Sequence, residues 1–296
     1  MTQEYWRWPE SRWTAGDVDW KKAGLITLGV DVGAVSSQAA VMCDDKLYCY
    51  ANMRTGPESA ASARNVTDKA LEGTGLKLKD IARTVATGIG RKNVAFAQQA
   101  TNEIECHLRG ARFMYGPSLR TLVDMGGEGT RAMKCTEYGR LTEFFVNDKC
   151  ASGMGRGVEL VSRLMHVPIT EMGPLSLTAG EQDPEPVTTT CYLFANTEAL
   201  GMYREGKKDN EVLSAYLFGV AYRIFTLVGR MKMEKDLAFT GGVAKNVGVV
   251  KRLERELGVT ALTSKYDTQL AGAIGAALFA QDLAAKPAKK AAVAAK

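Results

Sequence analysis

The sequence predicts an α/β protein that is folded into two lobes. Short hydrophobic runs of strand length alternate with longer segments of helical periodicity along most of the 296 residues, which is typical of this fold class. Three of the predicted strands lead into glycine-rich turns, and a strand, a glycine turn and an aspartate occur together once in each half of the chain. At roughly 150 residues per domain, the length also corresponds to about two lobes.

Five segments follow one another along the chain. We predict a tryptophan-rich extension over residues 1–23, a first lobe over 24–123, a second lobe over 124–267, a helix over 268–283 and an Ala/Lys-rich tail over 284–296. The extension contains all four tryptophans and has no clear helix or strand pattern. We expect it to fold over the protein's own surface. The alternative is an arm that docks onto a partner, because tryptophan is common at interfaces.

The regular pattern begins near residue 24. In the first lobe we predict strands over 25–30, 39–42 and 47–51, a helix over 59–72, a strand over 84–87, a helix over 93–112 and a strand over 119–124. Beyond these we predict a hairpin over 131–146, helices over 153–165, 192–203 and 210–231, a strand over 237–240, a helix over 245–257, a strand over 259–262 and a last helix over 269–283. The connection between the helices at 165 and 192 is rich in proline.

Composition and charge exclude several classes of protein. With 46% hydrophobic and 24% charged residues, the chain is neither disordered nor a small disulfide scaffold. Most of the net charge of +5 comes from the four lysines of the tail, so we expect no nucleic-acid binding. Because we find neither an apolar run of membrane-spanning length nor a signal-peptide pattern, we expect a cytoplasmic protein that does not bind a membrane. Its six cysteines are then reduced thiols or metal ligands.

Aspartates stand beside two of the three glycine-rich turns. The turns are GVDVGAVSSQAAV (29–41), LVDMGGEGTRAM (122–133) and LAFTGGVAKNVGVV (237–250). Glycine lets the backbone approach a phosphate closely, and consecutive N–H groups in such turns bind anions. Asp31 and Asp124, at the strand ends, suit hydrated Mg²⁺, which is usually held by one or two carboxylates together with substrate phosphates. No Walker A pattern is present, which disfavours a P-loop enzyme.

This order of strands, turns and aspartates resembles the superfamily of acetate and sugar kinases, Hsp70 and actin, whose two lobes clamp ATP. The resemblance implies that the helix over 268–283 returns to the first lobe. It implies that the β- and γ-phosphates face Asp31, Gly33, Ser36 and Ser37. It also implies a second phosphate turn, which orients Mg²⁺ or water, at Asp124, Gly126 and Gly127. The residues implied near the adenosine are Gly241, Gly242, Lys245 and Asn246.

Two of the six cysteines are candidates for a metal site. Cys150 in NDKCASGMGRGVEL and Cys191 in TTTCYLFANTEAL each come just before a predicted helix. The positive end of a helix dipole lowers the pKa of a thiol and favours a thiolate or an anionic cluster. Neither cysteine belongs to a CxxC pair, which disfavours a four-cysteine zinc site. The remaining four are expected to be buried as small hydrophobic side chains, namely Cys43, Cys49, Cys106 and Cys135.

These two cysteine motifs resemble the ATPase family that contains 2-hydroxyacyl-CoA dehydratase activators and the ATP-binding subunits of benzoyl-CoA reductase. The segment ATGIGRKNVAFAQQATNEIECHLRGA, which contains Glu103 and His107, is similar to that family as well. The resemblance implies a [4Fe-4S] cluster that two homologous ATPase protomers share at a helix, cluster, helix junction. Such a cluster usually takes four thiolates, and Cys150 and Cys191 supply two.

One residue departs from the family pattern. Gln38 stands where many members have a lysine, which leaves the positive charge at the γ-phosphate to be supplied by another side chain. The candidates are Arg91, Arg131 and Lys245.

Within this family we favour the ATP-binding subunit of ATP-dependent benzoyl-CoA reductase, an ATPase component of an oxidoreductase complex. It would couple ATP hydrolysis to electron transfer from a ferredoxin-type donor to the substrate-reducing subunits. The tryptophan-bearing extension favours a permanent heteromeric complex over a dissociating activator. The alternatives are an activator ATPase of a 2-hydroxyacyl-CoA dehydratase, a small N-acetylhexosamine or sugar kinase, and a nucleotide-dependent scaffold. Bound iron after anaerobic purification would indicate the reductase subunit or the dehydratase activator. Phosphorylation of hexosamines would indicate the kinase.

Overall fold

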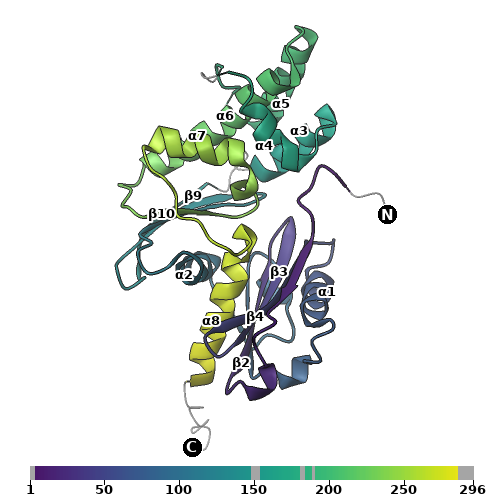
Figure 1. The fold of residues 1–296 in the computed structure, drawn as a ribbon, viewed down its shortest axis with the longest axis vertical. Helices are drawn as coiled ribbons and strands as arrows, with labels where there is room; N and C mark the ends of the chain where they lie inside the picture. Colours follow the sequence, from purple (N-terminus) through teal and green to yellow (C-terminus); the bar gives the residue numbers. More distant parts are fainter. Residues whose placement is uncertain (1–3, 148–153, 181–183, 189–190, 286–296) are drawn as a thin grey trace, which may run out of the picture.

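The computed structural model describes residues 4–147, 154–180, 184–188 and 191–285. Figure 1 shows two lobes, one above the other. The first lobe, at the bottom, is built on a six-stranded sheet, and the second lobe combines a four-stranded sheet with the helices above it. The predicted α/β class and the two lobes are therefore confirmed.

The six-stranded sheet has the strand order β1-β4-β3-β2-β5-β6. β2, β3 and β4 form an antiparallel meander, β5 and β6 continue it in parallel pairing, and β1 pairs with the outer edge of β4. The strands span Ser11–Thr14 (β1), Ile26–Val32 (β2), Ser36–Cys43 (β3), Lys46–Arg54 (β4), Arg83–Thr87 (β5) and Gln99–Ala100 (β6).

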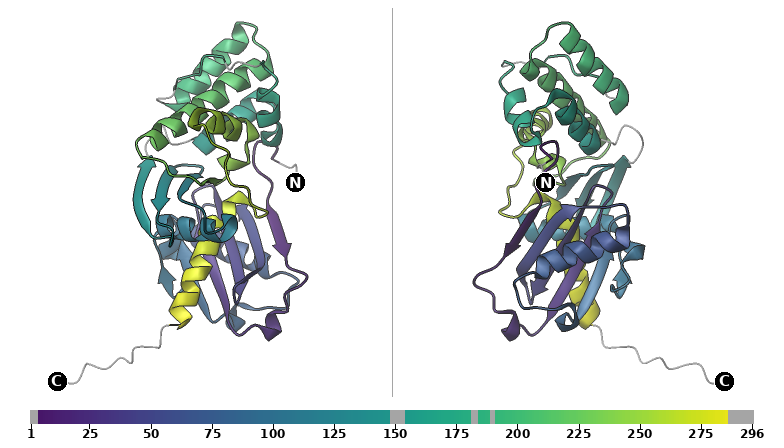
Figure 2. Two further views of the ribbon diagram at one scale, coloured as in Figure 1. Left: turned by 60° about the vertical axis from the view of Figure 1, so that its left-hand side comes forward. Right: turned by 90° about the vertical axis from the view of Figure 1, so that its right-hand side faces the viewer.

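A helix covers each face of this sheet. Helix α1 (Ser59–Leu71) packs on one face and α8 (Ala271–Ala285) on the other, as the two views of Figure 2 show. Since neighbouring side chains of a strand point to opposite faces, β2 sends Leu28 and Val30 into the core under α1 and turns Asp31 towards α8. The strand is buried on both faces, which explains its nearly continuous hydrophobic sequence.

The four-stranded sheet has the order β10-β7-β8-β9. Its strands are β7 (Thr121–Met125), β8 (Thr130–Cys135), β9 (Leu141–Asn147) and β10 (Leu237–Thr240). One face packs against the helices of the second lobe. These helices are α3 (Met154–Met165), α4 (Ile169–Ser176), α5 (Tyr192–Arg204), α6 (Asp209–Gly229) and α7 (Val247–Leu257). The other face packs against α2 (Glu103–Tyr115) and α8, so these two helices lie between the sheets.

Helices α2 and α8 approach each other closely because glycines face backbone at their crossing. A Cβ atom on Gly110 would overlap the carbonyl oxygen of Ala271, and one on Gly275 would overlap that of Cys106. On the opposite side of α8, a Cβ atom on Gly29 of β2 would overlap the carbonyl oxygen of Ala273. The expected packing of the last helix against the first lobe is observed, and that helix also joins the two sheets.

Several predicted elements differ from the observed ones. The helix predicted from residue 93 begins at Glu103, because Asn102 caps it with a hydrogen bond from the backbone of Ile104. Residues 259–262 form no strand and share only the hydrogen bond from Leu262 N to Leu237 O with β10. Helix α4 was not predicted, since it begins directly after Pro168 and contains a second proline.

Two further differences concern the limits of the lobes. Strand β1 lies inside the tryptophan-rich extension, so part of this extension belongs to the six-stranded sheet. Strand β7 lies wholly in the four-stranded sheet, so the chain changes sheets before Thr121 and not at Asp124.

Helix α6 is long and apolar enough to cross a membrane by length and composition alone, a property that we did not predict from the sequence. In the structure, 72% of the most apolar 18-residue stretch of this helix is buried inside the protein, as is usual for a core helix.

Replacement of Gly275 by alanine tests the close crossing of α2 and α8. We expect Gly275→Ala to lower the free energy of unfolding by about 2 kcal/mol or more, because the new methyl group meets backbone that cannot move aside. Gly201→Ala in α5 is the matched control, since nothing lies within 4 Å of its Cβ position, and alanine there stabilises the helix by up to about 1 kcal/mol. Urea unfolding measures both. Equal stabilities of the two variants would contradict the crossing described.

Candidate active site

A cleft of about 1130 Å³ lies where the two lobes meet. The first lobe contributes Asp31, the following turn and neighbouring side chains of β3 and β4, whereas the second lobe contributes Asp124, two glycine turns and the start of α3. Nine of the predicted site residues line the cleft: Asp31, Gly33, Ser36, Asp124, Gly126, Gly127, Gly241, Gly242 and Asn246.

The two aspartates stand on either side of one histidine. Asp31 near the end of β2 and Asp124 near the end of β7 are both buried. Between them, His107 of α2 places Nε2 3.4 Å from Asp31 Oδ2 and Nδ1 3.3 Å from Asp124 Oδ1. The Nδ1 contact has no hydrogen-bond alignment, so attraction between charges carries it. One imidazole on a helix between the sheets therefore links carboxylates that belong to different sheets.

The close fit around His107 depends on the next helix. A Cβ atom on Gly272 of α8 would overlap Asp31 Oδ2 and would lie 3.0 Å from His107 Nε2. Glycine at this position therefore allows α8 to pass directly over the histidine and the first aspartate. From the sequence alone His107 is expected to be mainly a structural histidine, whereas the structure shows that it lines the cleft.

These groups have shifted pKa values. Burial disfavours the charged form of His107, but attraction to Asp124 and to Asp31 outweighs it and raises the pKa to about 10. Burial also opposes ionisation of Asp124, but His107 and Arg131 together hold the pKa of that carboxyl well below its ordinary range. At neutral pH a histidinium therefore stands beside the ionised carboxyl of Asp124.

Arg131 completes the charge network on the side of the second lobe. Its guanidinium donates to Asp124 Oδ2 at 3.1 Å and lies 2.9 Å from Glu103 Oε2. Thr240 of β10 donates to Asp124 Oδ1 at 3.0 Å. Both oxygens of Asp124 are thus occupied by protein donors, whereas Asp31, which also lines the cleft, is in ion-pair contact with His107 through Oδ2.

The first turn is held by a network of neutral side chains. Gly33 donates its backbone N–H to Ser36 O at 3.1 Å, which closes the turn between β2 and β3. The Ser36 hydroxyl accepts from Gln38 at 2.8 Å and from Gln269 at 2.9 Å. Ser37 points the other way and hydrogen-bonds Thr55, as the alternation along β3 requires. Gln38, where the family pattern has a lysine, therefore supplies an amide and no charge.

The second turn touches the start of a helix. Gly126 and Gly127 lie at the cleft, and Arg156 N of α3 donates to Gly127 O at 3.1 Å. A Cβ atom on Gly155 would lie 2.7 Å from the Cα atom of Gly127. The second glycine turn and the first turn of α3 are therefore in direct backbone contact.

The third turn lies beside the second, because a Cβ atom on Gly241 would be 2.3 Å from Met125 O. Gly241 and Gly242 follow β10, and Asn246 caps α7 through a hydrogen bond from Val249 N. Lys245 does not line the cleft, because its ammonium forms a 2.8 Å ion pair with Asp267. Of the cations considered for the γ-phosphate, Arg131 alone is among the cleft residues that the structure describes.

The four cysteines that we expected to be core side chains are in the core, and the structure describes one of the two ligand candidates. Cys43, Cys49, Cys106 and Cys135 are buried. Burial raises the pKa of the Cys43 thiol to about 11 and those of Cys49 and Cys106 to about 12, which makes them unreactive. Cys191 is the N-cap residue of α5 and is partly exposed, and no side chain caps that helix. This position fits a thiolate that ligates an anionic cluster. Cys150 lies outside the described residues.

Replacement of His107 by glutamine tests the bridge between the aspartates. The pKa of His107 is raised from 6.5 to about 10, so its contribution to stability is fully present below about pH 6.5 and is lost as the pH rises through 10. We expect His107→Gln to lower the free energy of unfolding of the nucleotide-free and metal-free protein by about 3 kcal/mol at pH 6, and by much less at pH 9.5.

Urea unfolding at both pH values measures the difference, and His166→Gln, at the only other histidine in the sequence, is the control. A loss in His107→Gln that does not change with pH would exclude a charged His107.

Comparison with known proteins gives relatives that match over most of the chain. The chain is 37% identical to an "Activator of lactoyl-CoA dehydratase" from Anaerotignum propionicum, over 88% of this chain and 100% of the relative. It is 30% identical to a benzoyl-CoA reductase subunit from Thauera aromatica, over 86% of this chain and 92% of the relative.

Solved structures give the same result for the fold. The "Activator of the 2-Hydroxyisocaproyl-CoA Dehydratase from Clostridium difficile with bound ADPNP" matches with a TM-score of 0.83 at 31% identity, covering 92% of this chain and 100% of that one. A ROK family glucokinase from Streptomyces griseus matches with a TM-score of 0.53 at 11% identity, covering 87% of this chain and 99% of that one, and shows the shared fold alone. The sequence model of the BadF/BadG/BcrA/BcrD ATPase family matches residues 28–280, and the chain belongs to this family.

Proposed function

We propose that the protein is the activating ATPase of a 2-hydroxyacyl-CoA dehydratase and acts in the cytoplasm. The observation that carries this proposal is the 37% identity over the whole length of a lactoyl-CoA dehydratase activator, against 30% for the benzoyl-CoA reductase subunit. The tryptophan-rich extension favoured the reductase when the sequence was considered alone. The described part of this extension folds back onto its own chain, which removes the reason for that preference.

ATP would bind along the cleft between the lobes. Its phosphates would lie between the turn at Gly33 and Ser36 and the turn at Gly126 and Gly127, which both line the cleft. The adenosine would lie beside Gly242. Mg²⁺ suits the buried Asp31 better than Asp124, because both oxygens of Asp124 already accept hydrogen bonds from protein donors.

The charges around His107 suit hydrolysis of a phosphate anhydride. Negative charge builds up on the phosphoryl oxygens in the transition state, and fixed cations that need not reorganise stabilise it. His107 and Arg131 provide two such cations beside the carboxylates. Asp31 would keep a metal at the phosphates, and Asp124 would hold both cations in place.

The cluster would lie on the second lobe. Cys191 at the N-terminus of α5 and Cys150 before α3 would each donate a thiolate, and a second ATPase protomer would complete the four ligands. When bound, a [4Fe-4S] cluster supplies one-electron transfer at low potential. The electron would come from a ferredoxin-type donor and pass to the dehydratase.

Contact between α3 and the second glycine turn provides a route from ATP to the cluster. Arg156 N bonds Gly127 O, and Gly155 packs on the backbone of Gly127. A change in the phosphates at this turn would therefore shift the N-terminus of α3, which directly follows the segment containing Cys150.

Replacement of either aspartate tests the phosphate site. We expect Asp31→Asn and Asp124→Asn each to lower kcat for Mg²⁺-dependent ATP hydrolysis at least about a hundredfold, because charge neutralisation in the transition state is lost. Asp124→Asn should also lower the melting temperature, since it leaves His107 and Arg131 without their shared anion. Asp45→Asn, at an exposed turn, is the control. Near-normal turnover in both variants would place the phosphates elsewhere.

Replacement of the cysteines tests the cluster and the function together. We expect anaerobically purified protein to contain iron and, with a reductant and ATP, to activate a 2-hydroxyacyl-CoA dehydratase. Cys150→Ser and Cys191→Ser should lose the iron, the dimer and the activation, while Cys43→Ser and Cys135→Ser, at buried thiols, should keep them.

Iron and sulfide assays, gel filtration and dehydratase turnover measure these properties. If the protein supported reduction of benzoyl-CoA and not dehydration of a 2-hydroxyacyl-CoA, it would be a benzoyl-CoA reductase subunit. Iron-free protein that phosphorylates hexosamines would identify a kinase.

A further inference from the structure

Residues 4–10, which we call the N-terminal strap, run across the cleft from one lobe to the other. We propose that Trp8 of this strap forms the wall against which the base of the bound nucleotide stacks. This inference rests on the proposed placement of ATP in the cleft, and it assigns a base-binding residue to a segment outside the matched family region, which begins at residue 28.

The strap is fixed to the first lobe at its C-terminal end. It continues into β1, which pairs with β4, and Glu10 accepts a hydrogen bond from Arg54 N at 3.0 Å. The Arg54 side chain also forms a 3.2 Å ion pair with Glu4. The strap therefore starts from a defined position on the outer edge of the six-stranded sheet.

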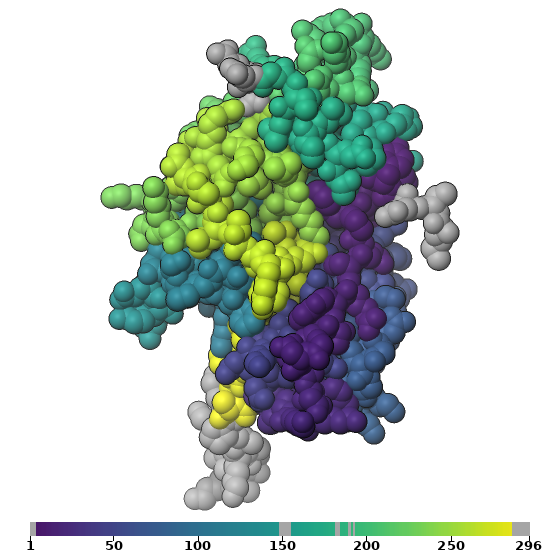
Figure 3. All heavy atoms as spheres, viewed as in Figure 1, coloured from purple at the N-terminus to yellow at the C-terminus, as the bar shows by residue number. Residues whose placement is uncertain are grey.

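The strap is fixed to the second lobe at its N-terminal end. Ile169 N, at the start of α4, donates to Tyr5 O at 2.9 Å, and the Tyr5 hydroxyl lies 3.0 Å from His166 Nδ1. The Arg163 guanidinium stacks over the Trp6 ring at 5.3 Å. Figure 3 shows this purple segment rising across the junction of the lobes to the teal helices. Residues between two such anchors are held over the cleft.

Trp8 lies between these anchors and beside the third glycine turn. Its Cδ1 is 3.6 Å from the Cβ position of Gly242, and the ammonium of Lys245 lies 5.9 Å from the centre of its ring. Trp8 lines the cleft and is only partly buried, so part of the indole remains open to a ligand. The ring is therefore held in place and accessible beside the third glycine turn.

The chemistry of this end of the cleft favours a flat, apolar ligand group. An indole offers an aromatic face on which any nucleobase stacks. Two arginines that line the cleft near the strap, Arg7 and Arg54, are both paired with Glu4 and so offer little charge to a phosphate. The cations that suit phosphates, His107 and Arg131, lie with Asp31 and Asp124 instead. We therefore expect the base of the nucleotide, and not its polyphosphate, to contact Trp8.

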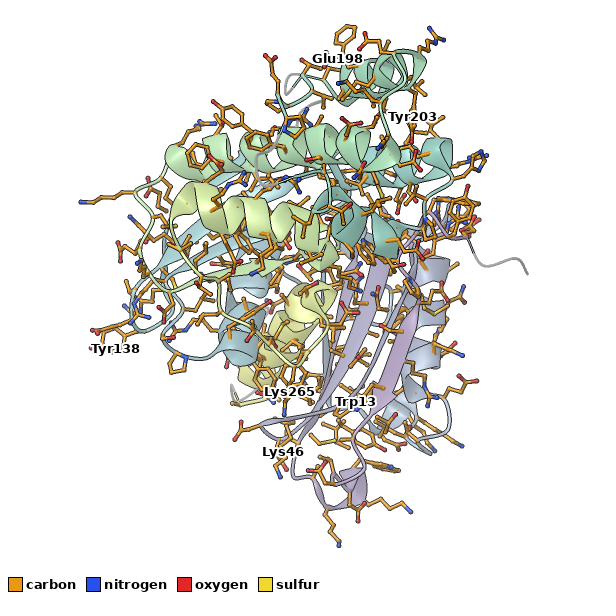
Figure 4. All side chains as sticks on the ribbon, turned by 45° about the horizontal axis from the view of Figure 1, so that its top comes forward. Trp13, Lys46, Tyr138, Glu198, Tyr203 and Lys265 are labelled. Carbon is orange, nitrogen blue, oxygen red and sulfur yellow. The ribbon has the colours of Figure 1, made fainter. Side chains whose placement is uncertain are left out.

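Calorimetry with ligands that have and lack a base tests the role of Trp8. We expect Trp8→Ala to weaken binding of a non-hydrolysable ATP analogue about tenfold, since it removes the stacking surface. Its affinity for tripolyphosphate, which has no base, should stay within twofold of the original. Trp8→Phe should keep most of the analogue affinity. Trp13→Ala is the matched control, because Trp13 stacks on Tyr50 at the outer edge of the first lobe, away from the cleft (Figure 4).

Other outcomes separate this inference from the proposed function. Unchanged analogue affinity in Trp8→Ala would overturn the role of Trp8, and increased affinity would show that the strap blocks the base site instead. Failure of the unmodified protein to bind the analogue would contradict the placement of ATP itself.

A second measurement does not depend on the stability of Trp8→Ala. In a variant with Trp6, Trp13 and Trp20 replaced by phenylalanine, Trp8 is the only tryptophan. Its fluorescence should change when the analogue binds and not when tripolyphosphate binds. Equal responses to the two ligands would contradict stacking.

Discussion

The placement of one histidine between two buried carboxylates is the interaction on which the site depends. Asp31 and Asp124 come from different sheets and are both almost fully buried, and two uncompensated charges there would be very costly. His107 lies between them on α2, and Arg131 adds a second positive charge beside Asp124. The same cations that make the arrangement stable also provide positive charge for a phosphate. Stability of the junction and chemistry of the cleft are therefore supplied by the same side chains.

This arrangement requires α8 to approach both α2 and β2 at backbone distance. Small residues make the approach possible, since Gly110 and Gly275 remove side chains from the helix crossing and Gly272 leaves room for Asp31 and His107. A larger residue at any of these positions would separate the sheets and move the carboxylates apart. The small, apolar residues of α8 thus fill the core and also set the distance between the sheets. Because α8 is buried on almost every face, its sequence lacks amphipathic periodicity.

The sequence predicted most of the regular elements, because β2, β7, β10 and the helices α1, α6 and α7 have a hydrophobic period or a buried apolar run that local chemistry determines. The glycine turns at strand ends, together with the resemblance to the superfamily, indicated nine of the residues that line the cleft. The sequence did not predict that His107 joins Asp31 to Asp124, because that contact depends on how two distant helices cross. Lys245 illustrates the same limit, since its pairing with Asp267 follows from the path of the chain after α7. Strand β1 was missed because it is short and pairs with a strand distant in sequence.

Two of the connections between the lobes differ in kind. On one side α2 and α8 pack between the sheets, and on the other the N-terminal strap connects β1 to the start of α4. A change in the angle between the lobes must pivot on the first contact, whose glycine-mediated backbone packing leaves little room for sliding. The same change must then alter the strap, whose contacts are single hydrogen bonds and exposed ion pairs that are individually weak. Movement of the lobes would thus change the position of Trp8 more readily than that of His107. The part of the cleft beside Trp8 is for this reason more adaptable than the part beside His107.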